Sequence, residues 1–229
     1  SNGGEAIVPW RLVTLLHDYC NELTVLVPHH AFSAATLTAL GADQVLMHPM
    51  GMLGPTDPSI MGPFNPTSPT NPQQALPVSV EDVASYIALI KDDVGIHHED
   101  ELVQTFLALA DKVHPLALGS VKRTTSQSRM LGEKLLRRRR KDEMPASNIE
   151  EVVRKLTSEL YFHGHPINAR EAQDDLGLHF VESATQPVAE AMWTLYEAYR
   201  TALTMNQQLN PVRAAITMSP FTVPPLPDA

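Results

Sequence analysis

The chain has few cysteines, few basic residues and no long apolar run, and each shortage excludes a class of protein. Its single cysteine, Cys20, cannot form an internal disulfide and gives no metal-binding spacing, which predicts a cytoplasmic protein without a metal site. No apolar run in the sequence approaches the roughly 20 residues that span a bilayer, and no signal peptide is visible. With 17 Lys and Arg against 26 Asp and Glu, the net charge is −9, which disfavours general binding to nucleic acid or anionic membranes.

Motifs that hold cofactors are also missing. The sequence contains neither a glycine-rich phosphate loop nor a dinucleotide-binding fingerprint, so we expect no cofactor. What is present is enough for a folded, soluble domain: 229 residues, of which 43% are hydrophobic and 19% charged.

The first 60 residues alternate between helical and strand patterns. Residues 23–27 and 44–47 are short, nearly apolar runs, which is typical of buried parallel strands. Helices are expected over 6–20 and 33–40. This order predicts an α/β domain with parallel pairing.

The rest of the chain is mostly helical. Seven prolines between Pro55 and Pro77 predict a long irregular loop, a candidate lid or binding loop. Apolar periodicity then predicts helices, and a short strand is expected near 178–181. We divide the chain into a partial α/β core (1–60), a proline-rich loop (61–78), a helical region (79–205) that returns to the core at 160–181, and an extended tail (206–229).

Ser33 is the candidate nucleophile. It lies at a strand–loop–helix junction among small residues, where a substrate can approach the backbone closely. The free N–H groups of a helix N-terminus can also bind the oxyanion of a tetrahedral intermediate. The alternative is that Ser33 only caps the helix.

Several motifs resemble one known family. They are the Gly3-Gly4 pair, the stretch VPHHAFSAATLTALGADQVLMHPMGMLGPTDPSI at 27–60, and the late segment from His163 to Leu178. Together they are similar to the serine dehydrogenase proteinase family of the Clp-protease/crotonase superfamily, which is related to signal peptide peptidase A. The resemblance runs from Gly3 to about Tyr199. It implies a crotonase/Clp-protease-like core whose first strand we expect to precede residue 1.

The resemblance also implies a catalytic triad. Carried over by motif, Ser33 is the nucleophile, Asp57 the orienting acid and His163 the general base. The N–H groups of Gly3 or Gly4 and of Ala34 would form the oxyanion hole.

Other residues compete for these roles. His165 is two residues from His163 and is the alternative base. Asp57 could instead only fix a turn. His48 follows a predicted strand and is treated as a wall residue, while His29 and His30 shape the entrance.

A lysine base is a further alternative, because signal peptide peptidases of this superfamily use a Ser–Lys dyad. Lys91 is the candidate, but Asp92 and Asp93 beside it suit a solvated helix end. The basic run 137–141 is likewise expected on a solvated helix terminus.

These observations predict a serine peptidase that cleaves peptide or protein substrates and assembles as a homo-oligomer, as superfamily members do. Membrane association is expected only through a segment outside this sequence. The alternatives are a catalytically inactive crotonase-fold scaffold and acyl-CoA chemistry on the same fold.

Overall fold

The computed structural model describes residues 1–56, 59–141, 143–159 and 164–203. A parallel sheet lies at its centre, in the order β1 (Thr24–Val27), β3 (Gln44–Met47) and β9 (Val181–Ser183). Thr24 pairs with Gln44, and Val45 pairs with Val181. The chain is therefore a mixed α/β protein with parallel strands, and the strands predicted near 23–27 and 44–47 are confirmed.

The third strand begins three residues later than predicted. The Leu178 N–H donates to the Ala172 carbonyl and the Val181 N–H to the Leu178 carbonyl, so 178–180 form a turn. Leu178 and Phe180 are apolar because they are buried in the core, and not because they belong to a strand.

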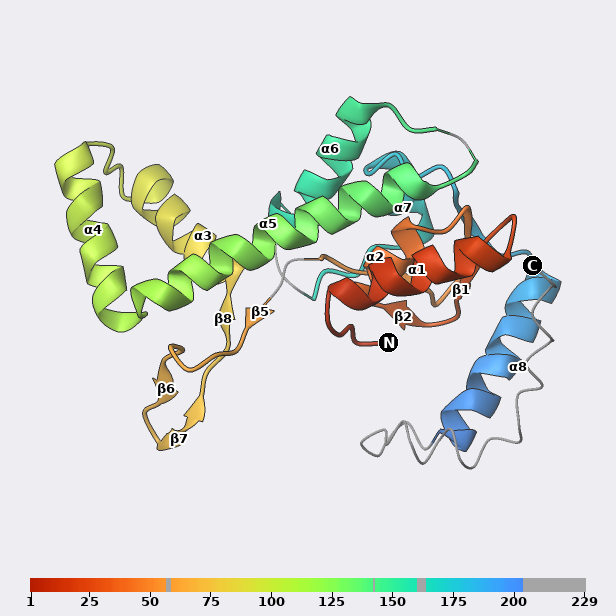
Figure 1. Cartoon of the computed structure of the whole chain (residues 1–229), viewed down its shortest axis with the longest axis horizontal. Coiled ribbons are helices and arrows are strands. Elements are labelled where there is room, and N and C mark those ends of the chain that lie inside the picture. Colours follow the sequence, from red (N-terminus) through yellow and green to blue (C-terminus); the bar gives the residue numbers. More distant parts are fainter. Residues whose placement is uncertain (57–58, 142, 160–163, 204–229) are drawn as a thin grey trace. The chain divides into compact units, whose positions relative to one another are not determined.

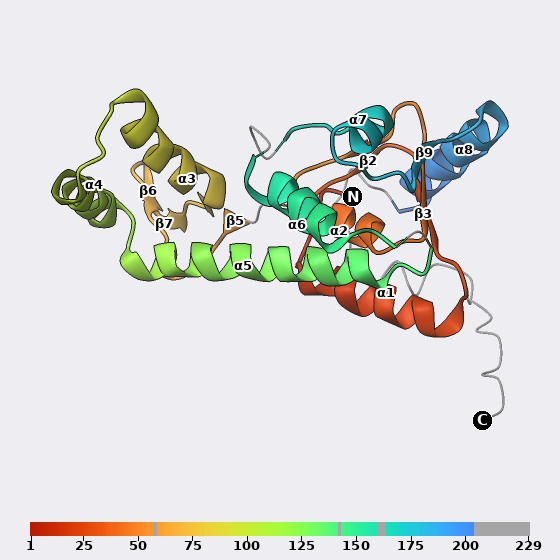
Figure 2. The ribbon, with the colours of Figure 1, turned by 90° about the horizontal axis from the view of Figure 1, so that it is seen from above.

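Helices pack around this sheet. α1 (Ile7–Tyr19) and α2 (Ala34–Leu40) contact each other, and both contact α5 (Pro115–Arg138), which also packs on α6 (Ala146–Arg154). Figure 2 shows α1 and α5 side by side. Close packing is visible at Gly41, where a Cβ would lie 2.8 Å from Leu135 Cδ2 and from Val13 Cγ1. The most buried side chains join these elements into one core: Val13, Leu37, Leu40, Val45, Leu135, Leu156, Ile167 and Leu178.

The proline-rich segment is more ordered than predicted. β5 (Ser59–Ile60) pairs antiparallel with β8 (Val78–Ser79), and β6 (Thr67–Ser68) with β7 (Asn71–Ala75). A two-stranded ribbon accommodates proline because each strand has an open edge that needs no donor. Asn65 Nδ2 donates to the carbonyls of Ile60 and Leu76, both at 2.8 Å, and closes the ribbon.

A pair of helices follows the ribbon. α3 (Val80–Ala88) continues into a π-helical turn, η1 (Leu89–Asp93), and α4 (Glu99–Lys112) leads into α5. α3 contacts α5, whereas the other end of α5 contacts α2, as Figure 1 shows. The 24-residue α5 therefore connects this helical pair to the sheet region.

The remaining helices complete the described chain. α6 continues into a second π-helical turn, η2 (Lys155–Glu159), and α7 (Ala169–Asp174) precedes β9. A separate unit begins at Thr185, and its described part contains α8 (Gln186–Ala202). Within the described ranges, no helix has both the length and the apolar character needed to cross a membrane.

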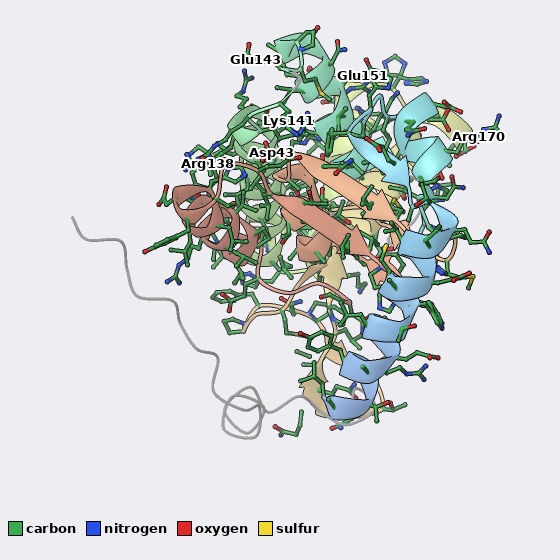
Figure 3. All side chains as sticks on the ribbon, turned by 90° about the vertical axis from the view of Figure 1, so that its right-hand side faces the viewer. Asp43, Arg138, Lys141, Glu143, Glu151 and Arg170 are labelled. Carbon is green, nitrogen blue, oxygen red and sulfur yellow. The ribbon has the colours of Figure 1, made fainter. Side chains whose placement is uncertain are left out.

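The basic run at the end of α5 lies only in part on the solvated face that was predicted for the whole run: Arg137, Arg140 and Lys141 are exposed, but Arg139 is buried. Arg139 is 7% exposed, donates through Nε to the Ala42 carbonyl at 3.0 Å, and stacks 3.6 Å from the Phe180 ring centroid. The Arg140 N–H donates to Asp43 Oδ1 at 2.7 Å. Figure 3 shows Asp43, Arg138 and Lys141 gathered beside α1. The run joins α5 to the loops that enter β1 and β3, because these loops present backbone carbonyls and the Asp43 carboxylate to its cations and N–H groups.

Candidate active site

The candidate site lies beyond the carboxyl ends of the parallel strands, where open α/β sheets bind ligands. After β1, the chain forms β2 (His30–Ala31), which pairs in parallel with β4 (Met52–Leu53). On its other side, the Ser1 nitrogen donates to the His30 carbonyl at 2.7 Å and the Phe32 N–H donates to the Ser1 carbonyl at 3.1 Å. Residues 30–32 are therefore hydrogen-bonded to neighbouring backbone along both edges, to β4 on one side and to Ser1 on the other.

Ser33 has an unusual backbone conformation. Its φ is 54° and its ψ is −115°, and it is the one non-glycine residue with positive φ in the described part of the chain. Such a conformation costs on the order of 1–3 kcal/mol in a non-glycine residue and concentrates at functional sites. Its side chain makes no capping hydrogen bond to α2. Ser33 therefore stands at the N-cap position of α2 without using its side chain as a cap. Its strained turn between strand and helix resembles that of a nucleophile elbow.

Gly3 packs directly against this serine. A Cβ at Gly3 would lie 2.8 Å from Ser33 Cβ and 3.3 Å from Ser33 Oγ, and its φ of +106° also requires glycine. The Gly3 N–H donates to Ser1 Oγ at 3.2 Å. Gly4 differs, because a Cβ there would meet nothing within 4 Å. The structure thus brings Gly3, and not Gly4, against the candidate nucleophile.

Ala34 occupies the first position of α2, where a backbone N–H has no intrahelical acceptor. The Ala35 N–H donates instead to the Phe32 carbonyl at 3.0 Å, and the Leu37 N–H to the Ser33 carbonyl at 3.1 Å. The Ala34 N–H is therefore the helix donor closest in sequence to Ser33 that could serve an oxyanion.

Thr36 joins the Ser33 turn to the segment that leads to Asp57. Its fully buried hydroxyl lies 2.7 Å from the Ala31 carbonyl and 2.9 Å from the Gly54 carbonyl, and it accepts the Gly54 N–H at 3.1 Å. A Cβ at Gly54 would lie 2.6 Å from Phe32 Cδ1, so the two segments are in close contact. Sequence reasoning missed Thr36 because its partner is 18 residues away.

Thr56, the residue before Asp57, is also fixed. Its N–H donates to the Leu156 carbonyl at 2.8 Å, and its own carbonyl accepts from Ser128 Oγ at 2.7 Å. Thr56 is 3% exposed. Asp57 itself lies outside the described residues.

An antiparallel bridge brings the segment around Ile167 next to β4, four residues before Asp57. Leu53 and Ile167 exchange backbone hydrogen bonds of 2.8 and 2.9 Å, and Ile167 is fully buried. Asp57 follows Leu53 by four residues, and His163 precedes Ile167 by four residues. His163 also lies outside the described residues, so only the ends of these two segments are seen to meet.

His165 forms an imidazole–carboxylate pair. Its Nε2 lies 2.6 Å from Glu171 Oε1, and both side chains are about a quarter exposed, at 25% and 22%. Glu171 is positioned by the predicted helix cap, since its N–H donates to Asn168 Oδ1 at 3.0 Å. Glu171 was not among the predicted site residues, although the Asn168–Glu171 capping pattern was the signal that places it at a helix start.

The three histidines near the strand ends have different surroundings. His30 Nε2 lies 2.7 Å from Asn2 Oδ1, which can only accept, so this nitrogen carries the proton. Burial lowers the pKa of His30, as do the amino terminus and the neighbouring His29. His29 Nδ1 then donates to His30 Nδ1 at 2.5 Å. His48 Nδ1 accepts the Met50 N–H at 3.0 Å, which shapes the turn after β3.

Lys91 belongs to a different part of the fold. It lies in η1 and, with Glu99 and Asp100, borders a groove between η1 and α4. None of the contacts described above for the Ser33 turn involves Lys91.

Comparisons with known proteins bear on the family of this chain. Residues 1–114 match the model of the family described as ClpP-like SDH-type serine proteinase. The chain is 29% identical to uncharacterized protein MJ0137 of Methanocaldococcus jannaschii over 86% of its length and 56% of the relative. It is 36% identical to uncharacterized protein MJ1495 of the same organism over 25% of its length and 20% of that relative. No solved structure matches the chain.

The chain thus spans little more than half of the longer match among these curated relatives. The matched region contains three described parts of the candidate site, namely Gly3, the strained Ser33 turn and the Thr36–Gly54 contact. Through residues 1–114, this chain belongs to the ClpP-like SDH-type serine proteinase family.

Proposed function

We propose that the chain is a serine hydrolase of Clp/crotonase type that cleaves peptide bonds with Ser33 as its nucleophile. The observation that carries the proposal is the strained, uncapped Ser33 at the start of α2, in contact with Gly3. Held this way, the hydroxyl projects from a sharp turn beside backbone N–H groups, which is the arrangement that acyl transfer needs.

The proposed reaction has two stages. Ser33 Oγ attacks the scissile carbonyl while an imidazole takes its proton, and the same imidazole then protonates the leaving amine as the C–N bond breaks. Water hydrolyses the acyl-enzyme with the imidazole again acting as base. The N–H of Ala34 would bind the oxyanion together with the N–H of Gly3, which would exchange Ser1 Oγ for the oxyanion as its acceptor.

His163 is the proposed base and Asp57 the proposed acid. Two sets of contacts support this assignment. The bridge between Leu53 and Ile167 joins the two segments four residues from Asp57 and four residues from His163. Thr56 is fixed by its hydrogen bonds with Leu156 and Ser128. His165 is the alternative base, supported by its 2.6 Å contact with the Glu171 carboxylate.

A fluorophosphonate serine probe tests the nucleophile. We expect labelling that maps to the peptide containing Ser33 and disappears in Ser33→Ala. Ser126→Ala, which alters an exposed serine of α5, serves as the matched control and should keep the label at Ser33. A folded protein that takes no label at Ser33 would contradict the proposal.

The same probe separates the two bases. His163→Ala and Asp57→Asn should lower the labelling rate by about 100-fold or more, the usual contribution of a general base. If His165→Ala and Glu171→Gln abolish labelling while His163→Ala does not, the base is His165. Circular dichroism of each variant checks that it is folded.

We also propose that copies of the chain assemble. α1 exposes Val8, Leu12, Leu15 and Tyr19 at 50%, 42%, 54% and 66%, and their 4-3-4 spacing places them on one helix face. Sedimentation velocity should show an oligomer that dissociates in Leu12→Ser/Leu15→Ser. An unchanged monomer for both proteins would contradict this part.

A further inference from the structure

α3, η1 and α4 form an open groove that the candidate active site does not use. The groove has a volume of about 520 Å³, and its apolar walls come from both sides of the pair. These wall residues are Ile87, Ile90, Leu102, Val103, Phe106 and Leu107.

The groove is unusually apolar for an exposed surface. Val103, Phe106 and Leu107 are 56%, 50% and 62% exposed, and no described side chain of α4 is buried. Large apolar side chains gathered in one exposed place mark interaction sites in soluble proteins. The volume of the groove and its exposed apolar walls are therefore typical of a surface that a binding partner covers.

The charge around the groove is strongly acidic. Residues 80–114 contain eight Asp and Glu against two Lys, a net charge of −6 out of −9 for the whole chain. Glu99 and Asp100 line the groove together with one cation, Lys91, and the first turn of α4 also contains Glu101. Asp92 and Asp93 are exposed in η1, next in the chain to Ile90 and Lys91 of the opposite wall.

The negative charge around the groove indicates which kind of molecule can bind there. A second copy of the groove would bring one net charge of −6 against another, which opposes self-association through this face. Anionic lipid surfaces and nucleic acids are repelled for the same reason. A polypeptide with apolar side chains flanked by Lys and Arg is attracted and also covers the apolar walls.

We propose that this groove binds a basic amphipathic helical segment of another polypeptide. The apolar face of the segment would lie on Val103, Phe106 and Leu107, and its cations beside Glu99 and Asp100. This is the helix-in-groove mode, read by apolar residues at i, i+3, i+4 and i+7. The proposal is independent of Ser33 and of any hydrolytic activity.

Fluorescence anisotropy with a labelled peptide tests the proposal on the full chain carrying Ser33→Ala, so that hydrolysis cannot consume the peptide. The probe is an amphipathic Leu/Lys helix, compared with a Leu/Glu helix of the same pattern and a scrambled Leu/Lys peptide. We expect saturable binding of the first only, weakened by salt because charges at the groove mouth are exposed. Equal binding of the scrambled peptide, or no binding, would overturn the proposal.

Matched variants locate the binding. Phe106→Ser/Leu107→Ser should weaken binding about tenfold or more, because two apolar contacts are lost. Glu99→Gln/Asp100→Asn should weaken binding at low salt and have less effect at high salt. Leu195→Ser, which alters a 49% exposed leucine of α8, is the control and should bind normally.

Two results of this series reject the assignment. If all of these variants bind the peptide as tightly as the parent protein, the peptide binds elsewhere. A change in sedimentation of the groove variants without peptide would make the face a contact between copies. Phe106 and Leu107 are at least half exposed, and Glu99 and Asp100 are also exposed, so the variants are expected to fold. Thermal melting verifies that they do.

Discussion

Ser33 and Gly3 depend on each other at the level of single atoms. The positive φ of Ser33 turns its side chain toward Gly3, where a Cβ would lie 2.8 Å from Ser33 Cβ. A methyl group at position 3 must therefore displace the serine, and it is also strained by the φ of +106°.

Gly3→Ala should accordingly abolish fluorophosphonate labelling of Ser33. Gly4→Ala is the matched control, because a Cβ at Gly4 meets nothing within 4 Å. We expect Gly4→Ala to label at close to the normal rate. Equal rates in the two variants would show that the Gly3–Ser33 contact does not control the nucleophile.

Thr36 offers a second test at the residue scale. Thr36→Val keeps the side-chain shape but removes the acceptor of the buried Gly54 N–H, so unfolding free energy should fall by about 2 kcal/mol. Thr36→Ser keeps the hydroxyl and should lose less. Urea unfolding of the three proteins measures both, and a Thr36→Val variant as stable as Thr36→Ser would refute the assigned role.

Site residues differ in how far the sequence alone predicts them. Ser33 and Gly3 were predicted because their motifs are local. Thr36 and Glu171 were missed, because the role of each depends on a partner that only the fold brings near. For Asp57 and His163, which lie outside the described residues, the sequence prediction stays a prediction.

At the scale of elements, periodicity predicted the two early strands and the helices around them. It failed in the proline-rich segment, where the prolines indicate irregular backbone but the ribbon β5–β8 and β6–β7 tolerates them at its open edges. It also failed at the end of α5, because the number of cations in a run does not reveal which carbonyls they reach.

The end of α5 therefore gives an element-scale prediction. Arg139→Lys removes the planar group that stacks on Phe180 and donates to Ala42, and should cost about 1–2 kcal/mol of unfolding free energy. Arg137→Lys, at an exposed position of the same run, should change it by less than about 0.5 kcal/mol. Chemical denaturation measures the unfolding free energy of both variants. Similar losses in both would mean that the contacts of Arg139 with Phe180 and Ala42 add no stability.

For the molecule as a whole, the buried His17 makes stability depend on pH. His17 is 2% exposed, and neither ring nitrogen has a hydrogen-bond partner among the described residues. Burial lowers its pKa; Asp43 at 3.6 Å opposes this effect, and Arg140 and Arg138 add to it. The unfolded chain therefore binds a proton here that the folded chain does not.

The sign follows from this difference in bound protons. The contribution of His17 to stability is complete above the unfolded pKa of about 6.5 and is lost as the pH falls below it. Thermal melting between pH 7.5 and pH 5 should show a falling Tm, and His17→Gln should flatten the fall. His30, whose pKa burial also lowers, contributes in the same direction, so some slope remains in the variant. An unchanged slope in His17→Gln would contradict the assignment.

α5 also has a mechanical consequence. Its 24 residues form a rod of about 36 Å, stiff along its axis, with α3 against one part and Ser128 bonded to the Thr56 carbonyl farther along. A displacement of α5 along its axis would move Ser128 as well as the part that contacts α3. Through the Ser128 hydrogen bond, it would also move the Thr56 carbonyl, one residue before Asp57.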